Sequence, residues 1–373
     1  MAHKILIITP WGERLGGAEE MLWLAISHFD QTRFEPTVAF LGPGAFEAEV
    51  RGAGIETVVI ATGRLRQPSA VVGSVCRLAE VIGRQQPRLV LSWSAKAHIY
   101  SAMAAVRAGV VNRLVWWQHT TPEGHWLERL ATVLPARAIG CSSEAGRLEQ
   151  GELWPRRDTF VVNPGVIVGP DPVHGNRELR SQLRIPPEVA VVGIVGRLQP
   201  NKGQHRFLHV IAALLERGHK VHGLVVGGDA HDLSPEFVPY LRRLIADLGI
   251  ESAVTMTGQV DDARPYFELM DIAVNASEQE SFPLTLLEAM AARAVVVTVR
   301  RDGRGEIVED GVNGVLTGST EPAELAEGIE SILVDPDRRR RLADNARRSS
   351  VERFSVEQMA DALASRLEAL LHA

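Results

Sequence analysis

The stretch DIAVNASEQESFPLTLLEAMAARAVVVTV, residues 271–299, has the pattern of a strand, a helix and a second strand. Its two ends, DIAVNAS and AVVVTV, are short apolar runs rich in β-branched residues, which is typical of buried strands. The middle, LTLLEAMA, consists mostly of good helix formers. A strand–helix–strand unit of this kind places its two strands parallel in one sheet. The stretch therefore predicts a parallel sheet covered by helices.

The same alternation of apolar runs and helical segments extends along the chain. A first series of runs comprises KILIIT, TVAFL, ETVVIA, RLVLSW, RLVWWQ, RAIGCS and TFVVN. A second series comprises AVVGIVG, KVHGLVVGG, AVTMTG, DIAVNAS, AVVVTV and NGVLT. Two such series predict an α/β protein with two Rossmann-like, doubly wound parallel-sheet domains.

Residues 163–188 lie between the two series and contain five prolines, a composition that marks a boundary between domains. We therefore predict an N-terminal domain at residues 1–165, a hinge linker at 166–186 and a C-terminal domain at 187–354. The remaining stretch, 355–373, reads as a helix, and we expect it to pack back across the hinge.

The composition indicates a globular protein. The 373 residues are 45% hydrophobic and 23% charged, and the two cysteines, Cys76 and Cys141, have no metal-ligand spacing. The first apolar run is too short for a signal peptide, and no run reaches the roughly 18 apolar residues of a membrane span. We expect a cytoplasmic protein with reduced thiols.

The net charge of −6 is distributed unevenly. Residues 1–165 hold 17 Lys and Arg against 15 Asp and Glu, whereas the rest of the chain holds 23 against 31. No dense basic stripe with interleaved aromatic residues is present, so we expect no nucleic-acid partner. The more basic first part is compatible with at most weak peripheral contact with the inner face of a membrane.

Polar and glycine residues follow several of the predicted strands, where ligands bind in open α/β sheets. Gly16 and Gly17 precede a helix, which fits either an anion site or a structural turn. Arg197 follows a strand and Lys202 precedes a helix, so the two cations can close on one phosphate group. Glu280 and Glu288 form a carboxylate pair that suits hydrolysis, metal binding or the binding of hydroxyl groups.

The order of these motifs resembles a known family. GRLQPNKG followed by EQESFPLTLLEAMA is similar to the retaining nucleotide-sugar glycosyltransferases of the GT-B architecture, family four, also called glycosyl transferases group 1. LGGAEEMLWLA, WWQHT, VVNPGV and GEIVEDGVNGVLT also resemble the family's segments, so the likeness covers nearly the whole chain.

The resemblance implies two domains facing a central cleft, with an acceptor bound mainly by residues 1–165 and a UDP- or GDP-sugar by the second domain. Glu288 would bind the ribose hydroxyls, and Glu280 those of the transferred hexosyl unit. The implied catalytic residues are His119, Glu280, Arg197 and Lys202. The implied donor-binding residues are Gly16, Gly17, Arg197, Lys202, Gly258, Val260, Glu280, Ser281, Phe282, Pro283, Leu284 and Glu288.

We expect no cofactor and no metal ion. The Asp-x-Asp sequence at 335–337 falls between two predicted C-terminal helices, away from the strand ends. The charge of the leaving nucleoside diphosphate would then be met by Arg197, Lys202 and helix-end amides. The acceptor is a hydroxyl group on a glycan, a lipid-linked molecule or a small molecule.

Five side chains outside these motifs carry expectations of their own. We expect His98 on a helix surface or an acceptor wall, and one member of the pair Trp116-Trp117 in the core. Arg293 and Arg304 stand where the family usually has smaller residues. Arg293 changes how its helix stops and is placed to line the cleft.

Other functions remain open at this point. A nucleotide-sugar epimerase or a phosphorylase shares the architecture, although no pyridoxal-phosphate lysine site is visible. A glycoside hydrolase would use the two carboxylates but would leave Arg197 and Lys202 without an anion. A non-catalytic nucleotide-sugar-binding protein is the alternative of a different class.

Overall fold

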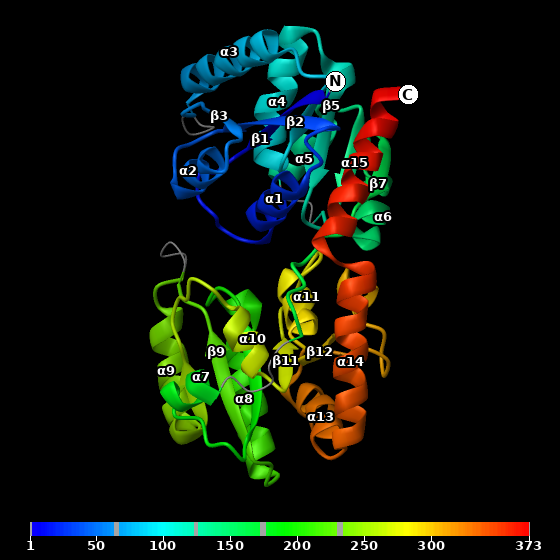
Figure 1. Cartoon of the computed structure of the whole chain (residues 1–373). Helices are drawn as coiled ribbons and strands as arrows, with labels where there is room; N and C mark the ends of the chain where they lie inside the picture. Colours follow the sequence, from blue (N-terminus) through cyan, green and yellow to red (C-terminus); the bar gives the residue numbers. More distant parts are fainter. Residues whose placement is uncertain (1, 63–66, 123–125, 172–176, 230–233, 373) are drawn as a thin grey trace. The chain divides into compact units, whose positions relative to one another are not determined.

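The computed structural model describes residues 2–62, 67–122, 126–171, 177–229 and 234–372. The chain forms two compact units (Figure 1). Unit 1 contains residues 1–165 and 356–373, and unit 2 contains residues 166–355. No helix in the described ranges is long and apolar enough to cross a membrane.

Unit 1 is built on a parallel sheet of seven strands in the order β3-β2-β1-β4-β5-β6-β7. Its elements are β1 (His3–Thr9), α1 (Gly17–His28), β2 (Phe34–Phe40), α2 (Ala45–Gly52), β3 (Glu56–Val59), α3 (Pro68–Gln85), β4 (Leu89–Ser92), α4 (Ala95–Ala108), η1 (Val111–Arg113), β5 (Leu114–Gln118), α5 (Trp126–Val133), β6 (Ala138–Cys141), α6 (Glu144–Glu152), β7 (Asp158–Val161) and α15 (Val356–His372).

Helices cover both faces of this sheet. In β1, Ile5 and Ile7 pack with α1 and α15, while Leu6 and Ile8 pack with α3 and α4 on the opposite face. Trp116 and Trp117 are therefore both fully buried, one on each face. The expectation that one of the pair lies in the core is confirmed, and the second lies there too because neither face of a doubly covered sheet is open to solvent.

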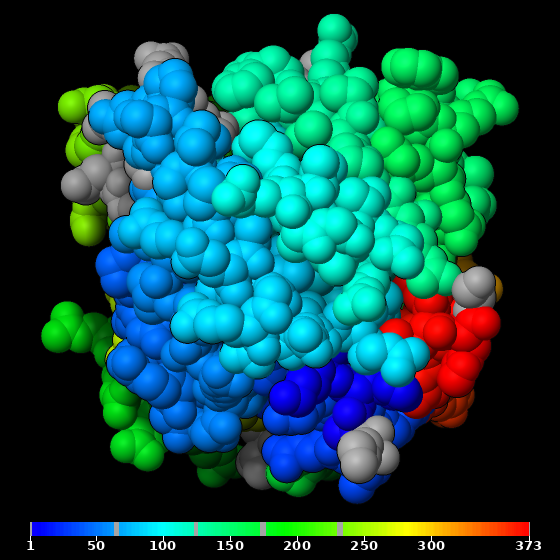
Figure 2. All heavy atoms as spheres, turned by 90° about the horizontal axis from the view of Figure 1, so that it is seen from above, coloured from blue at the N-terminus to red at the C-terminus, as the bar shows by residue number. Residues whose placement is uncertain are grey.

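The last helix, α15, belongs to unit 1 although it follows unit 2 in the sequence. Its buried residues Val356, Met359 and Leu363 join the core formed by α1 and β1. The guanidinium of Arg33 donates hydrogen bonds of 2.9 and 2.8 Å to the two carboxylate oxygens of Glu368. Seen from above, α15 lies beside the N-terminal part of the chain (Figure 2).

Unit 2 is built on a parallel sheet of six strands in the order β10-β9-β8-β11-β12-β13. Its elements are α7 (Arg177–Gln182), β8 (Ala190–Val195), η2 (Pro200–Lys202), α8 (Gln204–Glu216), β9 (Val221–Val226), α9 (Phe237–Asp247), η4 (Glu251–Ala253), β10 (Val254–Met256), α10 (Arg264–Leu269), β11 (Ile272–Asn275), α11 (Leu284–Ala291), β12 (Val295–Val299), α12 (Arg304–Ile307), β13 (Gly314–Thr317), α13 (Pro322–Leu333) and α14 (Pro336–Arg353).

The segment 166–186, predicted as a separate linker, is assigned to unit 2. Val166 and Ile185 are buried in the same apolar cluster as α11, and α7 lies within the segment. The described residues of this segment, 166–171 and 177–186, therefore include packed apolar side chains that a solvated linker would lack.

The strand order of each sheet reverses direction beside its first strand, between β1 and β4 in unit 1 and between β8 and β11 in unit 2. In open α/β sheets, ligands bind at the carboxyl ends of the strands at such a switch point. In unit 2 the two motifs GRLQPNKG (196–203) and EQESFPLTLLEAMA (278–291) follow β8 and β11 at this point.

Candidate functional site

The loop after β8 is pressed against the end of β11. Gly203 has φ +77 in the left-handed region, and a Cβ there would lie 2.2 Å from the carbonyl oxygen of Ala276. Only glycine fits this approach. Gln204 donates a 2.9 Å hydrogen bond from Nε2 to the carbonyl of Arg197, which closes the loop on itself. The loop thus holds Lys202 beside the loop that follows β11.

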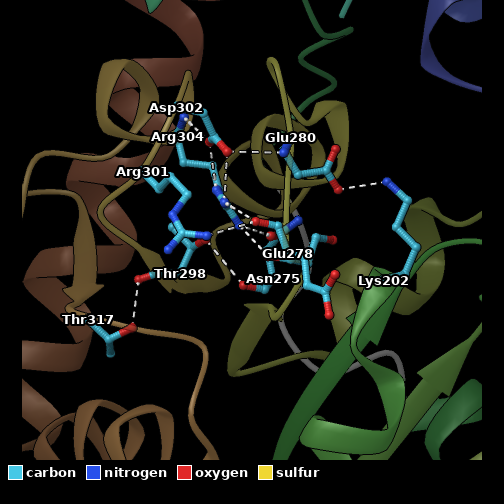
Figure 3. Close-up of polar contacts among 10 residues, drawn as sticks. Lys202, Asn275, Glu278, Glu280, Thr298, Arg301, Asp302, Arg304 and Thr317 are labelled. Atoms are coloured by element: carbon cyan, nitrogen blue, oxygen red, sulfur yellow. Dashed lines mark hydrogen bonds and ion pairs between the residues drawn. The ribbon is translucent and has the colours of Figure 1, made fainter. Parts of the chain in front are cut away.

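Lys202 and Glu280 meet in this position, although they are 78 residues apart. The Nζ atom of Lys202 lies 2.7 Å from Oε1 of Glu280, and the side chains are 23% and 14% exposed (Figure 3). The backbone N–H of Glu278 also donates a 3.0 Å hydrogen bond to the carbonyl of Asn201. A cation and a carboxylate therefore lie side by side at the switch point of unit 2.

The loop that follows β11, residues 276–283, is called the β11 loop. A buried arginine, Arg304, which is 0% exposed, lies against it. Its guanidinium donates to both carboxylate oxygens of Asp302 at 2.8 and 2.9 Å and to Oδ1 of Asn275 at 3.2 Å. It also donates to the carbonyls of Ser277 and Glu278, at 2.7 and 3.4 Å. Figure 3 shows these contacts converging on one guanidinium.

Helix α11 begins at Leu284, directly after the buried pair Phe282 and Pro283. Pro283 has φ −73, which suits a helix start, and its missing N–H leaves no unpaired donor there. The amino end of a helix, with its dipole, favours an anion or a hydroxyl oxygen. Glu288 lies one turn into the helix, within electrostatic reach of Arg264.

Gly258 and Val260 lie beyond β10, at the same edge of the sheet. The carbonyl of Gly258 accepts a 3.1 Å hydrogen bond from the N–H of Gly227, and Gly258 has φ +74. A Cβ on Gly227 would lie 2.0 Å from the carbonyl of Gly196, so the backbones after β8 and β9 approach closely. Most of the sequence-predicted donor residues are therefore in unit 2, around one sheet edge.

The other predicted residues, Gly16, Gly17 and His119, are in unit 1. Gly17 begins α1, and His119 follows β5 with its ring 4.9 Å from that of Trp93. Burial of the imidazole lowers the pKa of His119 to about 3, so this ring is neutral at physiological pH. Its buried Nε2 has no hydrogen-bond partner among the described residues.

His98 is not on a surface, contrary to expectation. It is 0% exposed, stacks on Trp116 with ring centroids 4.9 Å apart, and its Nδ1 lies 2.9 Å from the hydroxyl of Ser92. Burial lowers its pKa to about 3. His98 is a neutral core residue, because α4 turns this face onto the sheet.

Arg293 lies two residues after the end of α11 and has φ +62, a left-handed position that usually holds glycine. Its guanidinium pairs with Asp344 of α14. The side chain therefore links the turn after α11 to α14 within unit 2.

Sequence reasoning did not find Asp302 and Asn275, which fasten the β11 loop through Arg304. The available signal was Arg304 itself, a large cation at a position where the family has smaller residues. An arginine buried in a domain core requires acceptors, and Asp302 stands two residues before it. Within the described ranges, no group of three or more His, Cys, Asp or Glu side chains is arranged to hold a metal ion.

Comparison with known proteins finds similarity to glycosyltransferases. Residues 175–349 match the family model described as Glycosyl transferases group 1. This segment is just under half of the chain, and it is similar to that family. It is 35% identical over 192 residues to D-inositol 3-phosphate glycosyltransferase 2 of Catenulispora acidiphila, covering 50% of this chain and 45% of that protein. It is 27% identical to the lipopolysaccharide core biosynthesis glycosyltransferase LpsE of Rhizobium meliloti, covering 75% of each.

Among solved structures, Anabaena Alr3699/HepE in complex with UDP has a TM-score of 0.84 and 26% identity, covering 98% of this chain and 100% of that one. Sucrose-phosphate synthase from Thermosynechococcus elongatus has a TM-score of 0.80 at 19% identity, which supports the fold alone. The chain therefore has the GT-B fold. The chain spans about half the length of several curated relatives, including the Catenulispora protein.

Proposed function

We propose that this protein is a group 1 glycosyltransferase that moves a hexosyl unit from a UDP- or GDP-sugar to a hydroxyl acceptor, with retention of the anomeric configuration. The observation that carries the proposal is the Lys202–Glu280 pair at the switch point of unit 2. A cation next to a carboxylate suits a donor that has a diphosphate and a sugar in sequence. Anabaena Alr3699/HepE, the relative of similar structure, has been solved with UDP-glucose.

The family resemblance suggests a role for each of these residues of unit 2, and the chemistry of each side chain suits that role. Lys202 and Arg197 neutralise the negative charge that develops on the leaving diphosphate. Glu280 accepts hydrogen bonds from hydroxyls of the transferred sugar, and Glu288 from those of the ribose. The amides of residues 281–284 face the donor at the start of α11. The backbone at 258–260 contacts the base.

In unit 1 we assign His119 to the sugar and acceptor side of the reaction. Its imidazole is neutral, since its pKa is about 3, and its buried Nε2 has no partner among the described residues. A neutral ring nitrogen can donate or accept one hydrogen bond to a hydroxyl group. Gly16 and Gly17 contribute backbone amides at the start of α1.

The acceptor is a glycan, a lipid-linked molecule or a small molecule, in the synthesis of cell-surface polysaccharide or glycoconjugate. The name of one curated relative refers to the small molecule inositol 3-phosphate, and the name of the other refers to the lipopolysaccharide core. We place the reaction in the cytoplasm, with weak contact at the inner membrane face if the acceptor is lipid-linked. Retention on anionic vesicles at low salt tests that contact.

The decisive experiment identifies the donor and then asks for turnover. UDP, GDP and ADP are compared by thermal shift, because ligand at ~100 times its Kd adds roughly 2.7 kcal/mol of stability. The sugar conjugates of the stabilising nucleotide are then incubated with hydroxyl acceptors, and free nucleotide is measured. Acceptor-dependent release supports transfer. Conversion of the donor sugar without release indicates an epimerase, and binding without any turnover refutes the enzymatic assignment.

A further inference from the structure

The guanidinium of Arg304 has no donor left for a ligand. A guanidinium carries five N–H groups: one on Nε and two on each Nη. The Nε donates to Asp302, Nη1 donates to Asn275 and Ser277, and Nη2 donates to Glu278 and Asp302. All five are therefore used within the protein. An arginine beside a proposed diphosphate site is expected to bind the anion. Arg304 instead directs its guanidinium at backbone carbonyls of the β11 loop.

The bonds of Arg304 and Asp302 hold three backbone positions of the β11 loop. The carbonyls of Ser277 and Glu278 accept from Arg304, and the N–H of Glu280 donates to Oδ2 of Asp302 at 3.1 Å. The same Asp302 oxygen accepts from Arg304. The backbone of Glu280 is thus connected through one carboxylate to the buried guanidinium, while its side chain points to Lys202 (Figure 3).

The Arg304–Asp302 pair is itself connected to the sheet. Arg304 contacts the side chain of Asn275, the last residue of β11. The hydroxyl of Thr298 in β12 donates to the carbonyl of Asn275 at 3.2 Å, and the hydroxyl of Thr317 in β13 donates to the carbonyl of Thr298 at 3.3 Å. The ends of three adjacent strands are therefore tied together under the loop. Precise sites need such a rigid second layer of contacts.

We propose that Arg304, acting through Asp302, is a positioning residue that sets the orientation of the Glu280 carboxylate toward the donor sugar. This inference rests on the proposed function for the role of Glu280. Contacts within the protein occupy every donor of the buried guanidinium, and the loop that these contacts hold contains Glu280. Removal of Arg304 should leave the nucleotide-binding groups in place and should displace the carboxylate that contacts the reacting sugar.

The first test measures backbone mobility and needs no activity. In the full chain, Arg304→Gln is expected to raise amide hydrogen exchange about tenfold in peptides covering residues 276–282, while β8 and β12 keep their wild-type rates. Arg301→Gln is the matched control, because Arg301 is exposed and makes one 3.4 Å bond to the carbonyl of Glu278. Uniform acceleration across unit 2, or no change at 276–282, would overturn the proposal.

The second test asks whether Arg304 acts through Glu280. Arg304→Gln should lower kcat about tenfold or more in the wild-type background, but less than about twofold in a Glu280→Gln background, with little change in Kd for the nucleoside diphosphate. Independent losses that multiply would overturn the proposal. A wild-type protein without turnover on any nucleotide sugar would refute the proposed function instead, and the exchange test would still decide whether Arg304 fastens the loop.

A folding defect is controlled by a second variant. If Arg304→Gln does not fold, Asp302→Asn keeps the size of the side chain, removes its charge, and is examined by the same two measurements. Rescue of kcat by Arg304→Lys toward the wild-type value is not expected, since an ammonium cannot reproduce the two-pronged contact with Asp302. If both Arg304→Gln and Asp302→Asn abolish folding of unit 2, the pair serves the stability of the whole unit and the proposal is wrong.

Discussion

Replacing Lys202 with alanine is expected to remove most of the catalytic rate and little else. The Nζ atom lies 2.7 Å from Glu280 and is largely shielded from solvent, so its charge acts in a partly buried setting. Two unit charges at about 4 Å interact by about 4 kcal/mol at an effective dielectric constant near 20. Loss of one preorganised donor costs about 2.7–4 kcal/mol, or 10²–10³ in kcat. The two estimates agree in magnitude.

The assay is the initial rate of nucleotide release at saturating donor and acceptor. Lys220→Ala is the control, since Lys220 is exposed and its carbonyl accepts from Ala190 at the amino end of β8, the opposite edge of the sheet. The control should retain wild-type turnover. A Lys202→Ala variant with near wild-type kcat, in a reaction that strictly requires a divalent cation, would refute the electrostatic role of Lys202.

Three other predictions follow from the same structure. Glu280→Gln should lower kcat strongly and leave nucleoside diphosphate binding nearly unchanged, with the exposed Glu278→Gln as control; equal kcat values for the two variants would contradict the role of Glu280. Transfer should persist in EDTA, and NMR of the product should show the donor's anomeric configuration; activity that EDTA abolishes and Mg²⁺ restores would argue for a metal. The folded-state pKa of His98 is about 3, below its ordinary value of 6.5, so its contribution to stability is complete above pH 6.5 and is lost as pH falls toward 3. Urea unfolding should show that wild type loses about 1.4 kcal/mol more per pH unit below 6.5 than His98→Gln, and parallel pH profiles would exclude this effect.

The strands could be predicted from the sequence because both sheets are parallel and covered on both faces. Such strands are continuous apolar runs, and each run named from the sequence contains one strand of the two sheets. The motifs directly follow these runs in the sequence, so they were expected at strand ends, where Lys202 and Glu280 meet. The family resemblance supplied the roles of these residues, which local pattern alone left open.

The side-chain environment could not be predicted in the same way. His98 was expected on a helix surface or an acceptor wall, whereas its burial depends on contacts with Ser92 and Trp116. Arg304 is stabilised by Asn275, 29 residues earlier in the chain. Contacts of this range are set by the packing of elements, and they leave no periodic signal in the sequence.

The return of α15 to unit 1 determines the order in which this chain can fold during its synthesis. Unit 2 is a continuous stretch of sequence, so all its strands and helices have been made before α15 begins. All strands of unit 1 are synthesised before unit 2. The apolar surface of unit 1 that α15 covers, beside α1, stays exposed until Val356–His372 are made. The first part of the protein to be synthesised is therefore the last to complete its core, and an exposed hydrophobic surface persists while the second part folds.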